Sequence, residues 1–171
     1  ESDGPGSSFD SEVVQAWEAA ARELDGKGIR LVITRTGQVL SAEGGMLKEM
    51  LTPFKLGVGG PLAGGEQYLS WIHLEDEVGI LLWALDNESV SGIVNAASPN
   101  PATNKDFSKA LGRALNRPAV MPVPGLVLDL KFGKEFGQVL RGGQRVLPKR
   151  TQELGYEFKH PRLDEALRDL L

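Results

Sequence analysis

This chain of 171 residues contains no cysteine and only two histidines. Disulfides, thiolate catalysis and cysteine-bound zinc are therefore excluded, and the composition is compatible with a cytoplasmic location. His73 and His160 lie far apart, and neither has a second histidine at the spacing of a metal-ligand pair, so the sequence predicts no metal site. The formal net charge of -4 provides no basic face to neutralise phosphates. We therefore expect no nucleic-acid partner.

Long apolar runs are also absent, because the richest one is interrupted by Glu75, Asp76 and Glu77. A membrane-spanning helix needs about 20 mostly apolar residues, so we expect no membrane partner. The chain begins at Glu1 rather than methionine, and the polar, glycine-rich residues that follow have no apolar core of a signal peptide. We therefore expect this sequence to be a piece of a longer protein.

The stretch Gln67–Leu85 changes its hydrophobic period in the middle. Alternating side chains over Gln67–His73 predict a strand, and a helix follows whose first turn is acidic. Its side chains at helical spacing form an apolar face: Leu74, Val78, Leu81, Leu82 and Leu85.

At the corner between this strand and helix, polar and aromatic side chains gather where a pocket can form: Gln67, Ser70, Trp71 and His73. The alternative is that Trp71 belongs to the core and His73 caps the helix or bonds the local backbone.

Helices and strands alternate along the rest of the chain, which is typical of an α/β or α+β fold. Two short apolar runs, 29–34 and 91–96, predict strands buried in a parallel sheet. The predicted helices cover residues 9–24, 46–54, 126–140 in one or two pieces, and the C-terminus from Pro161, with one more opened by a Thr103–Asp106 cap. Residues 35–45 and 57–65 are interpreted as glycine-rich loops, and the second lacks the Lys-Ser/Thr of a phosphate-binding loop.

The later part of the chain is locally basic. Solvated helix faces explain this basicity unless several of the side chains converge in space on an anion. The residues are Lys131, Lys134, Arg141, Arg145, Lys149 and Arg150.

Several runs together resemble a known family: GIRLVITRTGQVL, EQYLSWIHLEDEVGILLWAL, GIVNAASPNPATNKDFSKAL and GQRVLPKRTQELGYEFKHP. They resemble an atypical group of extended short-chain dehydrogenase/reductases, the epimerase family proteins, over nearly the whole chain from Phe9. The resemblance implies an α/β fold in which residues 1–40 are the trailing helix and strand of an NAD(P)-binding Rossmann domain. Residues 41–171 would mainly form a C-terminal α+β substrate lobe, with 91–96 returning to the Rossmann sheet.

The resemblance also implies a cofactor, NAD or NADP, with a slight preference for NADP. The glycine-rich dinucleotide fingerprint is not in this chain, so the main cofactor site is expected in a missing N-terminal part. The loop RTGQVL resembles the segment that passes the nicotinamide, which makes Thr36, Gly37 and Val39 candidate cofactor contacts through their backbone. An ordinary loop at the end of a strand is the alternative.

For the substrate, the resemblance implies a small molecule such as a nucleotide sugar, bound by residues of the substrate cleft. The candidates are Gln67, Ser70, Trp71, His73 and Asn95. His73 is the one candidate acid or base among them. Asparagines such as Asn95 and Asn104 also serve commonly in turns, which is the competing interpretation.

The helix over residues 9–24 resembles the one that normally carries a catalytic Tyr-x-x-x-Lys pair, but Phe9 and Val13 stand at those positions. Neither side chain can transfer a proton. Two functions therefore remain open: an NAD(P)-dependent nucleoside-diphosphate-sugar epimerase or oxidoreductase, and a catalytically silent dinucleotide-binding regulatory or scaffold protein. A stand-alone domain of unrelated function is a third reading. The same helix resembles one used in family dimers, so we expect a homodimer.

Overall fold

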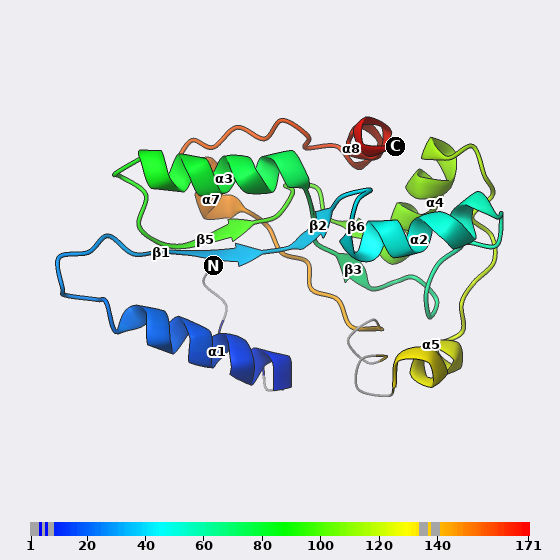
Figure 1. The fold of residues 1–171 in the computed structure, drawn as a ribbon, viewed down its shortest axis with the longest axis horizontal. Helices are drawn as coiled ribbons and strands as arrows, with labels where there is room; N and C mark the ends of the chain where they lie inside the picture. Colours follow the sequence, from blue (N-terminus) through cyan, green and yellow to red (C-terminus); the bar gives the residue numbers. More distant parts are fainter. Residues whose placement is uncertain (1–3, 5, 7–8, 134–136, 138–140) are drawn as a thin grey trace.

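The computed structural model describes residues 4, 6, 9–133, 137 and 141–171. One half of the molecule is built on a parallel pair of strands, β1 (Val32–Thr36) and β5 (Gly92–Ala96), with Thr36 opposite Ala96. Helices α1 (Phe9–Arg22) and α3 (Leu74–Asp86) lie on opposite sides of this pair, and α7 (Lys149–Glu153) packs against β5 (Figure 1). The predicted α/β fold class is confirmed.

The other half combines two short strand pairs with helices. Strand β2 (Gln38–Leu40) is parallel to β4 (Trp71–His73), and β3 (Tyr68–Leu69) is antiparallel to β6 (Ala102–Thr103). The helices here are α2 (Gly45–Lys55), α4 (Asn104–Ala114), α5 (Gly125–Phe132) and α8 (Leu163–Leu170) (Figure 1).

A single apolar core holds this half together, and it draws on β2, α2, β4, α4 and α8. Its largest members include Leu40, Phe54, Trp71, Phe107 and Leu167, all nearly fully buried. Burying side chains of this size stabilises a fold by about 1.5–3 kcal/mol each relative to leaving them in water.

Local capping signals act largely as the sequence predicts. The Thr103 hydroxyl accepts a hydrogen bond from the backbone N–H of Asp106 at 3.1 Å and donates to the Asp106 carboxylate at 2.7 Å, which caps α4. His73 caps α3, because its Nδ1 accepts a hydrogen bond from the backbone N–H of Glu75 at 3.1 Å.

The structure differs from the predicted elements in four places. The single strand expected over Gln67–His73 is two strands, because its two parts pair with different partners. Strand β3 pairs with β6, whereas β4 pairs with β2, beginning with the hydrogen bond from the N–H of Gln38 to the carbonyl of Ser70. For the same reason residues 38–40 form a strand within the predicted loop. The first strand begins at Val32 rather than Ile29, and the first helix ends at Arg22 rather than Leu24.

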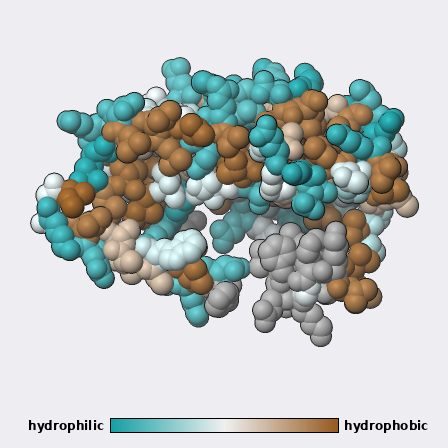
Figure 2. Space-filling view, in the orientation of Figure 1, coloured by the Kyte–Doolittle hydropathy of each residue, from teal (hydrophilic) through white to brown (hydrophobic). Residues whose placement is uncertain are grey.

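Helix α3 shows the largest difference from the sequence pattern. Its five predicted apolar-face residues are 42–70% exposed, whereas Asp76, Glu77, Ile80 and Ala84 are buried against the rest of the fold. Figure 2 shows an apolar patch on the surface where α3 lies in Figure 1. The apolar stripe of Leu74, Val78, Leu81, Leu82 and Leu85 therefore faces outward in this chain.

The helical segment predicted over residues 126–140 is confirmed only as α5. Residues 134–136 and 138–140 of its second part, and with them Lys134 of the basic segment, lie outside the described residues. Across the described part of the chain, the longest helices are too short or too polar to cross a membrane.

Candidate functional site

The carboxyl ends of β1 and β5 meet beside the predicted cofactor segment. The N–H of Gly37 donates to the carbonyl of Ala96 at 2.8 Å, just past the last paired residues of the two strands. A Cβ atom at Gly37 would lie 2.4 Å from the carbonyl oxygen of Ser70, so only glycine fits there. Ligands of open α/β sheets bind outside the carboxyl ends of the strands. The fold thus brings Thr36, Gly37 and Ser70 to the edge where such a ligand is expected.

The backbone N–H and C=O of Val39 point away from β4 at this edge. In a parallel ladder, bonding and non-bonding residues alternate along a strand. The N–H of Gln38 donates to the carbonyl of Ser70 at 2.7 Å, so Gln38 is the residue of β2 that bonds β4. The N–H and C=O of Val39 consequently point away from β4. Such a pair is complementary to a carboxamide, which offers one carbonyl and one amino group.

Glu77 lies directly behind this segment on α3. Its Oε1 accepts a hydrogen bond of 2.9 Å from the hydroxyl of Thr36, while its buried Oε2 has no hydrogen-bond partner among the described residues. Glu77 is 9% exposed, and burial raises the pKa of its carboxyl group. The sequence assigned Glu77 only to the acidic first turn of a helix, and nothing in the pattern marks it as buried.

Ser70 and Asn95 hold one segment, residues 143–147, which we call the strap. The hydroxyl of Ser70 donates to the carbonyl of Gln144 at 2.5 Å and accepts the N–H of Val146 at 2.9 Å. The amide of Asn95 donates to the carbonyl of Leu147 at 3.0 Å. Two predicted substrate residues from different strand ends thus converge on the same stretch of chain.

Gln67 and Asn104 are joined to each other near β3 and β6. The backbone N–H of Asn104 donates to the carbonyl of Gln67 at 2.8 Å, and the Gln67 side-chain amide donates to the carbonyl of Leu62 at 3.1 Å. The side-chain oxygen of Asn104 accepts the N–H of Leu62 at 2.7 Å. These polar groups organise the glycine-rich loop that precedes β3.

Trp71 and His73 are placed differently from the other candidates. Trp71 is fully buried in the core, and its Nε1 donates to the carbonyl of Asn100 at 2.9 Å. His73 is 4% exposed, caps α3 and stacks on the ring of His160 with the ring centroids 3.8 Å apart. In this chain both side chains make the packing and capping contacts that the sequence offered as the alternative to a pocket.

His73, His160 and Asp169 form a cluster of potential metal ligands within 4.8 Å of one another. Because Nδ1 of His73 accepts the cap hydrogen bond, the neutral ring carries its proton on Nε2, which then has no lone pair for a metal. Nε2 lies 3.3 Å from Asp169 Oδ2 without the alignment of a hydrogen bond. The pKa of His73 is lowered, mainly by burial and secondly by the neighbouring His160. We interpret the cluster as a docking contact for α8.

Asp76 fastens the C-terminal segment to α3, which sequence reasoning missed. Its two carboxylate oxygens accept the N–H groups of Lys159 at 2.8 Å and His160 at 2.9 Å, and the Tyr156 hydroxyl lies 3.3 Å away. Asp76 is 1% exposed. In the sequence it is indistinguishable from its exposed neighbour Glu75.

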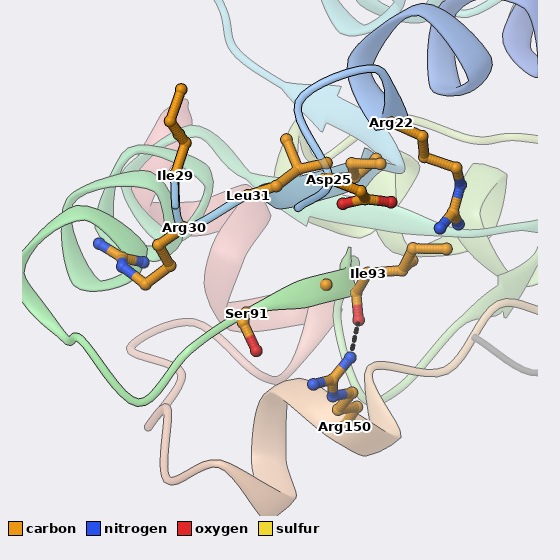
Figure 3. Close-up of a pocket in the computed structure, with 10 residues that line it drawn as sticks. Arg22, Asp25, Ile29, Arg30, Leu31, Ser91, Ile93 and Arg150 are labelled. Carbon is orange, nitrogen blue, oxygen red and sulfur yellow. Dashed lines mark hydrogen bonds between the residues drawn. The ribbon is translucent and has the colours of Figure 1, made fainter. Parts of the chain in front are cut away.

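A pocket of about 530 Å³ lies at the opposite, amino ends of β1 and β5 (Figure 3). Two of its guanidinium groups bond backbone carbonyls: Arg30 Nη1 donates to Ala84 at 2.7 Å, and Arg150 Nη1 donates to Ile93 at 3.0 Å. Because ligands of α/β sheets bind at the carboxyl ends, and because these arginines already hold the fold, we do not include this pocket in the candidate site.

The sequence of this chain matches one family model and several known proteins. A family described as "Domain of unknown function (DUF1731)" matches residues 123–170. The epimerase family protein SDR39U1 of Homo sapiens is 44% identical over 171 residues, which are 99% of this chain and 58% of that protein. The epimerase family protein MT2273 of Mycobacterium tuberculosis is 41% identical over 167 residues, 98% of this chain and 56% of that protein.

Solved structures match equally widely. The crystal structure of human epimerase family protein SDR39U1 with NADPH is 42% identical with a TM-score of 0.95, and the match covers 99% of this chain and 57% of that one. A nucleoside-diphosphate sugar epimerase from Corynebacterium glutamicum is 28% identical with a TM-score of 0.77, over 99% of this chain and 32% of that one. The chain thus spans a little over half the length of the human and mycobacterial relatives.

Proposed function

Because this chain belongs to the epimerase family proteins, we propose that it is the second half of an NAD(P)-dependent nucleoside-diphosphate-sugar epimerase or oxidoreductase. Its role would be to close over the nicotinamide end of the cofactor and to supply the substrate lobe. The hydride chemistry would belong to the nicotinamide, with the protein providing position and electrostatics. The observation that carries this proposal is the backbone of Val39, which is free of the β2–β4 ladder and lies beside the carboxyl ends of β1 and β5.

The residues fit a nicotinamide at this place. The N–H and C=O of Val39 are free of the β2–β4 ladder, and glycine at position 37 lets the segment cross Ser70 closely. Thr36 is held from behind by Glu77. In the proposal, Val39 pairs with the carboxamide, and Thr36 and Gly37 shape the turn that carries it.

The edge of β1 that is free in the described part of the chain, and the exposed apolar stripe of α3, support the packing of a further part of the protein on the β1 side. Among the described residues β1 pairs with β5 alone, which leaves its other edge without a strand. An α-helix has 3.6 residues per turn, which fixes the order of the side chains around the axis of α3. Next to the side that contacts Tyr156 lies the buried side, and Glu77, which bonds β1, lies between the buried side and the apolar stripe. The stripe therefore lies on the side of the open β1 edge, where further strands and helices of a Rossmann domain would pack.

This arrangement supports the domain division expected from the sequence. Residues 1–40 and 91–96 would belong to the Rossmann half, since β1 and β5 pair in parallel, and the rest of 41–171 would mainly form the substrate lobe. The dinucleotide's phosphates would be bound by the part of the protein that precedes this chain. We propose NADP over NAD because the human relative was solved with NADPH.

A second function is supported by one observation, the Phe9 and Val13 that replace the expected Tyr-Lys pair. The His73 ring, fixed as an Nε2–H donor by its capping bond and buried, offers no replacement base. A dinucleotide-binding protein without turnover would show cofactor affinity but no oxidation or reduction of nucleotide sugars. Turnover that survives His73→Asn would show that the acid or base comes from elsewhere.

Self-association is a further part of the proposal. Helix α1 exposes Trp17 by 71% and Val14 by 43%, which are large apolar side chains on a helix joined to β1 by the Glu18–Arg35 ion pair. Light scattering coupled to size exclusion would give the mass of a dimer, and Trp17→Ser would return it to a monomer. A monomer at every concentration contradicts this part.

Calorimetry with NADPH tests the proposed function. We define the joined protein as this chain fused behind the portion of the human relative that it does not cover. The joined protein should bind NADPH more tightly than NADH, and residues 1–171 alone should bind neither tightly, because the phosphate anchor is elsewhere. Tight binding by the chain alone, or a folded joined protein without binding, would contradict the proposal.

A further inference from the structure

The strap is fixed to the body of the molecule at four backbone positions. At its start, Gly143 lies so close to β3 that a Cβ atom there would be 2.4 Å from the carbonyl oxygen of Tyr68. Gln144 and Val146 both bond the hydroxyl of Ser70, and Leu147 bonds Asn95. The backbone on each side of position 145 is therefore held in place.

Arg145 is the exposed cation that this held backbone carries. The carbonyl of Gln144 and the N–H of Val146, which flank Arg145 in the backbone, both bond the hydroxyl of Ser70. The guanidinium of Arg145 lies over the ring of Tyr68, with Cζ 5.7 Å from the ring centroid. A cation within about 6 Å of an aromatic face is attracted to it, and the contact limits the freedom of the long side chain.

The guanidinium of Arg145 has no ion pair or hydrogen bond within the part of the chain that the structure describes. Arg22 and Arg168 are likewise without such partners in the described residues, whereas several other arginines are paired. Arg113 pairs with Asp164 at 2.7 Å, Arg35 pairs with Glu18 at 2.6 Å, and Arg30 caps the end of α3 through backbone carbonyls. The N–H groups of the Arg145 guanidinium are thus available to a ligand, and the backbone that carries this side chain is held in place.

The position of Arg145 is set by the same residue that sets the cofactor segment. The carbonyl of Ser70 accepts the N–H of Gln38, next to Val39, while the hydroxyl of Ser70 holds the residues on both sides of Arg145. In Figure 1 the strap runs through the middle of the molecule and leads into α7.

We propose that Arg145, supported by Tyr68, is an anion-binding site for a phosphate or diphosphate group of the substrate. The planar guanidinium matches phosphate oxygens with two parallel hydrogen bonds, and a side chain held in advance loses little freedom on binding. As a statement about substrate, this inference rests on the proposed function, whereas anion binding by the strap does not.

Calorimetry with inorganic pyrophosphate, uridine diphosphate and uridine tests the site on the 171-residue chain. Arg145→Gln should weaken binding of both phosphate probes about tenfold or more, as expected for lost hydrogen bonds to a charged group. Arg145→Lys should recover only part of the affinity, because it keeps the charge but not the fork. Lys149→Gln is the matched control. It removes the same charge from an exposed side chain nearby, and it should change affinity less than twofold.

Equal losses in Arg145→Gln and Lys149→Gln would overturn the proposal in favour of diffuse charge, as would no binding of either phosphate probe to a folded wild-type chain. Tighter binding of uridine diphosphate than pyrophosphate, with uridine unaffected by the variants, would support a nucleotide substrate; equal binding would support the phosphate group alone. In the joined protein, Arg145→Gln should leave NADPH affinity unchanged. Failure of the anion site and failure of the cofactor proposal are therefore distinguishable.

Discussion

The hydroxyl of Thr36 donates a hydrogen bond of 2.9 Å to Glu77, which joins the carboxyl end of β1 to a buried acid of α3. The second oxygen of Glu77 has no partner among the described residues, and burial raises the pKa of the group. A neutral carboxylic acid suits this position better than an anion, because an unpaired charge in a buried site is costly.

We expect the stability of the chain to depend on the protonation of Glu77. Because its folded-state pKa lies above the ordinary 4.5, the stabilisation is complete below that value and is lost as pH rises through the raised pKa. Glu77→Gln, which keeps the shape without the charge, should remove this decline above pH 4.5. The exposed Glu88→Gln serves as the control and should follow the wild type in urea unfolding. A wild-type stability that rises over this window in parallel with Glu77→Gln would contradict the prediction.

Gly37 should tolerate no side chain. A Cβ atom 2.4 Å from the Ser70 carbonyl oxygen forces a backbone shift, so Gly37→Ser should destabilise the chain by about 1–3 kcal/mol. At Gly44, which caps α2 with φ -162, a Cβ meets nothing within 4 Å. Gly44→Ser should therefore be neutral or slightly stabilising. Thermal unfolding of the pair tests this, and similar melting temperatures for both variants would refute it.

Asp76 should be more important for stability than any other acid of α3. Asp76→Asn leaves one of two backbone N–H donors, from Lys159 or His160, without a carboxylate oxygen, which costs about 1–3 kcal/mol. Amide hydrogen exchange at these two residues should accelerate along with the loss in unfolding free energy. Asp86→Asn, at the exposed end of the same helix, is the control. Unchanged protection in Asp76→Asn would show that the carboxylate does not hold this segment.

The His73–His160 stack predicts a depressed titration of His73. Since burial and then His160 lower the pKa of His73 below 6.5, its contribution to stability is complete above pH 6.5 and decreases as pH falls toward the folded-state pKa. His160→Phe preserves a stacked ring but removes the neighbouring charge, so the pKa of His73 should rise while staying below 6.5. Imidazole proton shifts in NMR measure both values. A pKa of His73 at or above 6.5 in the wild type would contradict the assigned burial.

Much of the fold could be predicted because it follows local rules. The parallel strands at 29–34 and 91–96, the Thr103 cap of α4 and the helix after His73 were all visible as periodicity and capping residues. The apolar face of α3 could not be oriented, because the sequence does not show that this face points outward while Asp76 and Glu77 are buried.

The candidate site was harder to predict for a related reason. Strands far apart in the sequence end at one edge of the sheet, and this brings together four candidate residues: Thr36, Gly37, Ser70 and Asn95. The resemblance to the family pointed to these residues, whereas the composition did not. Arg145 was one basic residue among six, and only its contacts distinguish it from a solvated lysine. The GG pair before it, one of whose glycines fits closely against Tyr68, was the available signal.

The most direct test of the account is the backbone amide resonance of Val39 in the joined protein, labelled with ¹⁵N-valine and titrated with NADPH. If Val39 meets the nicotinamide carboxamide, its amide should shift on binding and show an NOE to the nicotinamide ring, while the amide of exposed Val120 stays unchanged. Saturating NADPH that leaves the Val39 amide unmoved and without such an NOE would contradict the central claim.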